Sequence, residues 1–262
     1  MKAYRVHEYG DAAKFIEDEV NKPSAKQGHV VVEVKASSLN PVDHKLLKSD
    51  LGINPALPGI LHMDVSGVIT EVGEGVTDFK TGDEIYGCAG GLQGEAGNIE
   101  GALADFMLAD SNLIALKPKS LSFSESAALP LVTITAWEGL FDRAHIKKED
   151  HVLIHGGAGG VGHIAIQLAR QHGARVATTV SSEDKAKVAR GLGAEGIIFY
   201  RDEKIEDYTQ RLTKGKGFDA VFDTIGADNL DKSLEAAKVN GQVISVIGSN
   251  NHNLTPMHKK GL

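Results

Sequence analysis

Gly157-Ala158-Gly159-Gly160-Val161-Gly162 is the stretch of sequence that decides the fold. It matches the pattern G-x-G-x-x-G, which becomes specific when it follows a strand and opens a helix. An apolar run over 151–155 precedes it, and a stripe of apolar residues at helical spacing follows it. We therefore predict a dinucleotide-binding turn, in which Gly157 permits the tight turn, Gly159 admits the pyrophosphate and Gly162 lets helix and strand pack. The residues expected to line it are Gly157, Gly159, Gly160, Val161 and Gly162.

The sequence after this turn alternates between strand and helix signals. Further strands are expected at 175–180, 196–200, 218–223 and 242–248, and helices at 203–212 and 230–239. A capping box, Ser181-x-x-Asp184, is expected to open another helix. This alternation predicts an α/β fold with a doubly wound parallel sheet covered by helices on both faces.

The first part of the chain has a different pattern. Apolar residues alternate with period two over 29–36, and β-rich runs at 64–73 and 84–87 are separated by Gly-containing turns. Six glycines between Gly87 and Gly101 predict a loop. We predict a β-rich domain over 1–120 and a nucleotide-binding domain over 121–262.

Composition excludes several classes of protein. The net charge of the 262 residues is −7, which gives no support to nucleic-acid binding. The single cysteine, Cys88, excludes an intrachain disulfide and a multi-cysteine zinc site. The sequence contains neither a signal core at its start nor an apolar run of membrane-spanning length. We therefore expect a cytoplasmic protein without a membrane partner.

The end of the second expected strand indicates which cofactor is bound. An NAD site usually places an acidic residue there, whereas this strand ends in hydroxyl side chains followed by a lysine. Glu183 is the alternative, since a shift of one or two residues would let it serve NADH. We favour NADPH. The residues expected at its 2′-phosphate and adenine are Ser181, Ser182, Lys185 and Tyr200.

The segment 155–169 resembles the medium-chain dehydrogenase/reductase superfamily, and within it the zinc-independent quinone oxidoreductase branch. Other matching segments follow in the same order and span nearly the whole chain: 40–43, 64–69, 82–87, 128–130, 135–136 and 221–226. The resemblance implies a GroES-like catalytic domain followed by a Rossmann domain. It also implies that Thr135 lies beside the nicotinamide, and Gly226 and Gly248, which follow strands, are expected to border the cofactor.

The resemblance also predicts that no zinc is bound. The superfamily's zinc alcohol dehydrogenases have a cysteine ligand where this sequence has Asn40, and another near Leu131 and Val132. A neutral carboxamide is a poor Zn²⁺ ligand beside a thiolate. His62 is retained, and we expect it to pack or to form a hydrogen bond.

Without a metal to stabilise an alkoxide, hydride transfer to a quinone or an α,β-unsaturated carbonyl is the favoured chemistry. Asn40 is the candidate polar group near the nicotinamide or the substrate oxygen, although Asn40-Pro41 is also typical of a turn that places a helix. Asp43 and Lys45 are further catalytic candidates, with His44 beside them. The alternatives are a zinc alcohol dehydrogenase and an NADPH-binding protein without turnover.

Nothing after Gly248 is typical of a closing strand or helix. Members of the superfamily continue beyond this point, so the resemblance implies that the last Rossmann strand and the completion of the catalytic domain are absent from this sequence. A homodimer is expected for a full-length chain.

Overall fold

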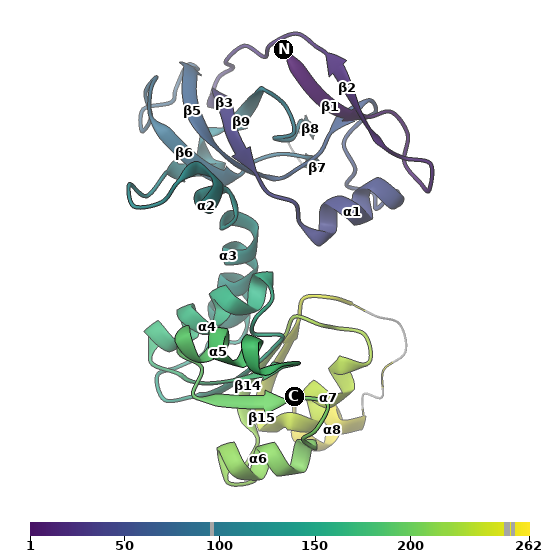
Figure 1. Ribbon diagram of the computed structural model, residues 1–262, viewed down its shortest axis with the longest axis vertical. Coiled ribbons are helices and arrows are strands. Elements are labelled where there is room, and N and C mark those ends of the chain that lie inside the picture. Colours follow the sequence, from purple (N-terminus) through teal and green to yellow (C-terminus); the bar gives the residue numbers. More distant parts are fainter. Residues whose placement is uncertain (95–96, 249–251, 253–254) are drawn as a thin grey trace. The chain divides into compact units, whose positions relative to one another are not determined.

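β-branched residues in the second half of the chain build a five-stranded parallel sheet (Figure 1). Its strands are β11 (His151–His155), β12 (Arg175–Val180), β13 (Gly196–Phe199), β14 (Phe218–Asp223) and β15 (Ala237–Ser245). Their order across the sheet is β13-β12-β11-β14-β15, the order of a Rossmann sheet. The predicted doubly wound sheet is therefore confirmed.

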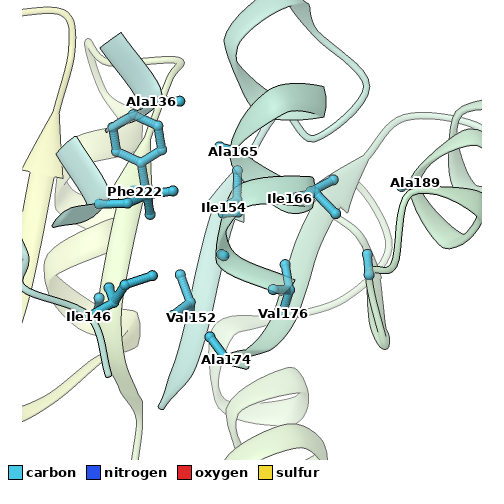
Figure 2. Close-up of a cluster of buried hydrophobic side chains, with 14 of the residues drawn as sticks. Ala136, Ile146, Val152, Ile154, Ala165, Ile166, Ala174, Val176, Ala189 and Phe222 are labelled. Carbon is cyan, nitrogen blue, oxygen red and sulfur yellow. The ribbon is translucent and has the colours of Figure 1, made fainter. Parts of the chain in front are cut away.

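Alternation along each strand divides the apolar residues between the two faces of this sheet. Val152 and Ile154 join one buried cluster, whereas Leu153 joins the other. Figure 2 shows the first cluster, with Ile154, Ile166 and Phe222. This cluster includes residues of α4 (Gly160–His172) and α5 (Glu183–Gly191), and the second includes residues of α6 (Ile205–Thr213) and α7 (Asn229–Ala236). Helices thus cover both faces.

The structure is a computed structural model that describes residues 1–94, 97–248, 252 and 255–262. The chain divides into unit 1 (Met1–Leu131) and unit 2 (Val132–Leu262). This division falls later than position 120 because α2 (Phe123–Ala127) packs on strands of unit 1. The next elements are α3 (Pro130–Trp137) and a π-helical turn, η2 (Glu138–Arg143).

Unit 1 is built on antiparallel sheets. Its central sheet has the order β10-β6-β5-β3-β9, and a smaller sheet has the order β2-β1-β4. Valine and isoleucine side chains of the central sheet form its buried cluster. The strands are β1 (Lys2–Val6), β2 (Phe15–Glu19), β3 (His29–Ser37), β4 (Gly59–Ile60), β5 (Asp64–Val72), β6 (Glu84–Cys88), β9 (Phe106–Asp110) and β10 (Ile114–Leu116). The helical elements are α1 (Pro41–Lys48) and the 3-10 turn η1 (Ser111–Leu113).

Three local predictions are wrong. The glycine-rich stretch 87–101 contains a hairpin, β7 (Leu92–Gly94) with β8 (Gly97–Ile99), whose residues 95–96 lie outside the described part. Helix α5 is capped by Ser182, whose hydroxyl accepts from the backbone of Lys185, one residue later than the predicted cap. Strand β15 begins at Ala237, inside the predicted helix, because Ala237 pairs with Phe218.

A helix also follows Gly248, contrary to the prediction. Helix α8 spans Thr255–Lys260, and Lys260 Nζ donates hydrogen bonds to the carbonyls of Leu234, Glu235 and Ala237. The ammonium group therefore satisfies carbonyls at the C-terminal end of α7 that have no partner within the helix. Residues 249–251 and 253–254 lie outside the described part. No helix among the described residues combines the length and apolar character that crossing a bilayer requires.

We expect Gly139→Ala to lower the free energy of unfolding by about 1–3 kcal/mol. A Cβ at Gly139 would lie 2.3 Å from Cε2 of Phe222, whose ring is fully buried. Gly191→Ala is the matched control, because no heavy atom lies within 4 Å of its added Cβ. This control should stabilise the helix by about 0.5–1 kcal/mol. Urea denaturation followed by circular dichroism measures both, and equal effects would contradict this packing.

Candidate functional site

The loop between β11 and α4 is shaped by two positions that have no room for a side chain. A Cβ at Gly157 would lie 2.0 Å from Oγ1 of Thr178, and one at Gly162 would lie 2.2 Å from the carbonyl oxygen of Gly156. The backbone conformation that requires glycine is found one residue earlier than predicted, at Gly156, whose φ is +72°. Gly157 is therefore required by close packing against β12 and not by the turn.

The other side of the loop is open. Gly159 is the N-cap of α4 and, like Gly160, is exposed. The first amides of a helix have no acceptor within it, so Gly160, Val161 and Gly162 present N–H groups at the positive end of the helix dipole. This 13-residue helix, whose start carries no side chain beyond Cα at Gly159 and Gly160, fits the pyrophosphate of a dinucleotide.

Hydroxyl groups of β12 hold the loop in place. Thr178 Oγ1 donates to the carbonyl of Ile154 at 2.6 Å, and Thr179 Oγ1 accepts from the N–H of Gly156 at 3.0 Å. Both threonine side chains are buried. The two hydroxyls thus fix the start of the glycine turn against the neighbouring strand.

The predicted 2′-phosphate residues gather where β12 and β13 end. Val180 pairs with Phe199 in the sheet, so Ser181 and Tyr200 are the next residues of two adjacent parallel strands. Ser182 caps α5, and Lys185 is exposed in its first turn. Tyr200 is 48% exposed, so its side chain is accessible to a ligand. Four of the predicted residues therefore come from one edge of the sheet.

At this edge, two acidic side chains form ion pairs, whereas two basic side chains form none with the described residues. Glu183, the alternative ribose ligand, forms an ion pair with Arg190, and Glu203 pairs with Arg211. Among the described residues, no carboxylate pairs with Lys185 or Arg201. The guanidinium of Arg201 lies 5.4 Å from the centre of the Tyr200 ring. The edge thus keeps two cations for an anionic ligand, while Glu183 and Glu203 are paired with arginines of the helices.

The turn after β14 is organised by Asp223. Its Oδ1 accepts from the N–H groups of Ile225 and Gly226, at 2.9 and 3.0 Å, and its Oδ2 accepts from Ser233 Oγ at 3.0 Å. Gly226 has a φ of +68°, and a Cβ there would lie 2.5 Å from Cβ of Ile247. Gly248 is open, since no heavy atom of the described residues lies within 4 Å of an added Cβ.

In unit 1, a second set of predicted residues surrounds the buried carboxylate of Asp64. Its Oδ2 accepts from Ser38 Oγ at 2.6 Å and from Asn40 Nδ2 at 2.9 Å, and its Oδ1 accepts from the N–H of Leu131 at 2.9 Å. Burial raises the pKa of Asp64, whereas these hydrogen bonds oppose that rise. We call Ser38, Asn40, Asp64 and Leu131 the Asp64 network.

Asp43 joins this network, and Lys45 does not. Asp43 is 1% exposed, its Oδ2 accepts from the N–H of Asn40 at 2.7 Å, and burial raises its pKa. Lys45 is exposed on α1, with no side-chain hydrogen bond or ion pair to the described residues. His62 Nδ1 lies 3.0 Å from Ser37 Oγ, and burial lowers the pKa of His62.

Thr135 lies on α3, where its side chain is half-buried. It belongs to unit 2, as do the glycine loop and the cation-bearing edge. The predicted site residues are thus divided between the two units, with Asn40, Asp43 and Lys45 in unit 1 and the others in unit 2.

Comparisons with known proteins agree with this arrangement. A model described as the alcohol dehydrogenase GroES-like domain matches residues 26–119, and one described as zinc-binding dehydrogenase matches residues 160–260. The chain is 31% identical to a quinone oxidoreductase from Pongo abelii, over 95% of this chain and 73% of that protein. The chain belongs to the medium-chain dehydrogenase/reductase superfamily, in its quinone oxidoreductase branch. This confirms the predicted family, with a GroES-like domain and a Rossmann-type sheet.

Two further similarities place the chain within this superfamily. An NADPH-dependent alkenal/one oxidoreductase, chloroplastic, from Arabidopsis thaliana is 36% identical over 95% of this chain. The chain spans 63% of the length of that relative. The crystal structure of an alcohol dehydrogenase superfamily protein from Novosphingobium aromaticivorans matches with a TM-score of 0.92 and 39% identity, over 100% of this chain and 77% of that chain.

Sequence reasoning did not single out Arg201, Asp64 or Asp223 as site residues. Arg201 directly follows Tyr200, so a search for cations beyond both strand ends could have found it. Asp64 and Asp223 gave no such signal, because their partners are recognised only once the strands are placed side by side.

We expect stability to fall as the pH drops from about 6.5 to 4, in part through His155 in β11. This side chain is 3% exposed, and burial lowers its pKa to about 4. The unfolded chain takes up a proton near pH 6.5, before the folded chain does, so protonation favours unfolding across this interval. The contribution is on the order of 3 kcal/mol. His155→Gln should remove it from the pH dependence of urea denaturation.

His44→Gln, at an exposed position of α1, is the matched control and should keep the pH dependence of the wild type. A His155→Gln variant whose unfolding free energy falls as steeply as that of the wild type below pH 6.5 would show that His155 is not the group responsible.

Proposed function

We propose that this protein is an NADPH-dependent reductase that transfers a hydride to a quinone or an α,β-unsaturated carbonyl without zinc. The observation that carries this proposal is the pair of unpaired cations, Lys185 and Arg201, beside hydroxyl groups at the sheet edge next to the glycine loop. A 2′-phosphate distinguishes NADPH from NADH and carries the charge that such an edge would neutralise. The names of the plant and primate relatives support the same cofactor and substrate classes.

Each part of unit 2 has a defined task in holding the cofactor. The amides at the start of α4 would bind the pyrophosphate, and the Tyr200 ring would cover the adenine side. Ser181, Ser182, Lys185 and Arg201 would bind the 2′-phosphate, while Thr135, Gly226 and Gly248 would border the rest of the cofactor. When bound, NADPH supplies a hydride from its nicotinamide ring.

The donor groups in unit 1 are poorly suited to zinc. The amide nitrogen of Asn40 donates both to Asp64 and to Ser38, which leaves only its neutral carbonyl oxygen, and zinc prefers thiolate, imidazole and carboxylate ligands to such an oxygen. Leu131 contributes only its backbone N–H, which also donates to Asp64. A conjugated acceptor suits this chemistry, because it spreads the charge that arrives with the hydride over several atoms.

Among the catalytic candidates, Asn40 is proposed to touch the ligand. Asp43 accepts a hydrogen bond from the backbone N–H of Asn40. It would therefore act through Asn40, as a positioning residue. Lys45, an exposed cation in the last turn of α1, is proposed as the third catalytic candidate.

We also propose a homodimer in the cytoplasm. Strand β15 lies at an edge of the five-stranded sheet described here, and an edge strand offers unpaired N–H and C=O groups to a partner. The cytoplasmic location rests on the single cysteine, Cys88, whose thiol stays protonated because burial and the nearby Asp64 raise its pKa to about 12, so the chain has no need of an oxidising compartment to form an intrachain disulfide. Light scattering of the purified protein tests the dimer.

We expect Lys185→Ala and Arg201→Ala each to weaken NADPH binding about tenfold to a hundredfold, because each removes a charge-assisted hydrogen bond worth about 1.5–3 kcal/mol. NADH lacks the 2′-phosphate, so its dissociation constant should change little. Fluorescence titration of the full chain measures both cofactors.

Lys187→Ala is the matched control, since Lys187 lies on the same helix and pairs with Asp184. It should leave both dissociation constants near those of the wild type. Equal weakening of NADPH and NADH by Lys185→Ala or Arg201→Ala would contradict the assignment of these residues to the 2′-phosphate.

We expect NADPH to be oxidised in the presence of a simple quinone or a simple enone, at a rate that a metal chelator does not change. The loss of NADPH absorbance at roughly 340 nm measures the rate of oxidation with and without the chelator. Loss of turnover on chelation, with recovery on adding zinc, would contradict the metal-free proposal. Tight NADPH binding without oxidation by either acceptor would contradict the reductase.

A further inference from the structure

We propose that Asp64 is a positioning residue that fixes the orientation of the Asn40 carboxamide, so that Asn40 offers a ligand a hydrogen-bond acceptor and not a donor. The ligand group that it receives would be an N–H or O–H, such as a carboxamide or a hydroxyl. A carbonyl oxygen of the substrate would not be bound by Asn40. The orientation of the amide stands without the proposed function, whereas the identity of its ligand rests on that function.

The hydrogen bonds to Asp64 indicate that its carboxylate is an acceptor only. Donors from three separate positions converge on it: the hydroxyl of Ser38, the amide of Asn40 and the backbone N–H of Leu131. The Asn40 amide and the Leu131 N–H can only donate, so a protonated carboxyl group could place its proton only towards Ser38, which would then have to give up its own donation to Asp64. The three donors therefore favour the ionised form, against the rise in pKa that burial causes.

The same network uses both protons of the Asn40 amide. Nδ2 donates to Asp64 Oδ2 at 2.9 Å and to Ser38 Oγ at 3.1 Å. Ser38 can accept because its own hydroxyl proton is donated to Asp64. Turning the amide over would place Oδ1 against the carboxylate and the serine oxygen, which are both acceptors here. Only one orientation of Asn40 satisfies all three side chains.

What remains for a ligand is the oxygen of the amide. Asn40 forms a capping box with Asp43 at the start of α1. An amide oxygen has two lone pairs, so Oδ1 keeps acceptor capacity beyond the cap. Asp64 is 0% exposed, and its carboxylate, held by three donors, places negative charge directly beside the Asn40 amide. A developing oxyanion would be repelled there, whereas a positively polarised N–H or O–H would be attracted.

The first test examines the amide itself by NMR in the protein without ligand. The two Nδ2 protons of Asn40, assigned through bonds to the backbone amide of Asn40 in the wild type, should exchange with water far more slowly than those of Asn112. Asn112 is the internal control, because its Nδ2 also donates to a carboxylate, Asp110 Oδ1 at 2.9 Å, but in an exposed position. Asp64→Asn should speed the exchange of the Asn40 protons.

Ser66→Ala is the control for Asp64→Asn, because it removes another buried side-chain hydrogen bond from the same strand, β5. Ser66 donates to the carbonyl of Ile85 and is not part of the Asp64 network. It should leave the exchange of the Asn40 protons slow. Exchange as fast as that of Asn112 in the wild type would overturn the proposal, and this measurement needs no variant that might fail to fold.

The second test asks which ligand supplies the donor, with pairs that differ in one donor group. NADPH is compared with its 3-acetylpyridine analogue, which lacks the carboxamide N–H, and a hydroquinone is compared with its dimethyl ether. We expect the wild type to prefer the donor-bearing member of one pair about tenfold, the effect of one hydrogen bond. In Asp64→Asn this preference should fall towards unity, and in Ser66→Ala it should persist.

The pair that shows the preference identifies the source of the donor as cofactor or substrate. Equal affinity within both pairs in the wild type would overturn the ligand assignment. If the wild type binds no NADPH at all, the proposed function fails instead, while slow exchange of the Asn40 protons would still support the positioning by Asp64.

Discussion

The backbone of the 156–162 loop lies so close to β12 and to itself that two of its positions have no room for a Cβ. Contacts of 2.0 Å at Gly157 and 2.2 Å at Gly162 would be unavoidable with any other residue. This steric constraint fixes where α4 begins and leaves Gly159 and Gly160 open at its N-terminus. The capacity of unit 2 to bind phosphate depends on that close approach, because the free amides of α4 are displayed only when the helix starts at this point.

In each unit, a buried carboxylate fixes the position of loops that carry site residues, as close packing at the glycines fixes the 156–162 loop. Asp223 accepts from two backbone N–H groups of the turn after β14 and from Ser233 in α7. Asp64 accepts from side chains that precede and open α1 and from the backbone at the start of α3. In both cases an acceptor-only group collects donors that would otherwise be buried without partners, and so fixes loops that carry site residues.

The sequence was sufficient for the β11–α4 turn, the parallel sheet and the family, because these depend on local spacing and on hydrophobic period. It was insufficient where distant residues decide the outcome. The partners of Asp64 lie 24, 26 and 67 positions away, so no local pattern reveals them. The hairpin at 92–99 was missed because its glycines are typical of loops, although Leu92 pairs with Ile99. Helix α8 was missed because its six residues are too few for a periodic signal.

The two groups of site residues have opposite electrostatic character, and this constrains which part of a ligand each can bind. In unit 2, amides of α4 and the cations Lys185 and Arg201 offer donors and positive charge, which suit phosphate oxygens. In unit 1, the buried carboxyl oxygens of Asp43 and Asp64 accept hydrogen bonds from Asn40, whose amide protons are already used. A reductase must bind an anionic cofactor tail and also tolerate positive charge on the ring that gives up the hydride. The group in unit 2 therefore suits phosphate oxygens, whereas the group in unit 1 suits a positively polarised N–H or O–H.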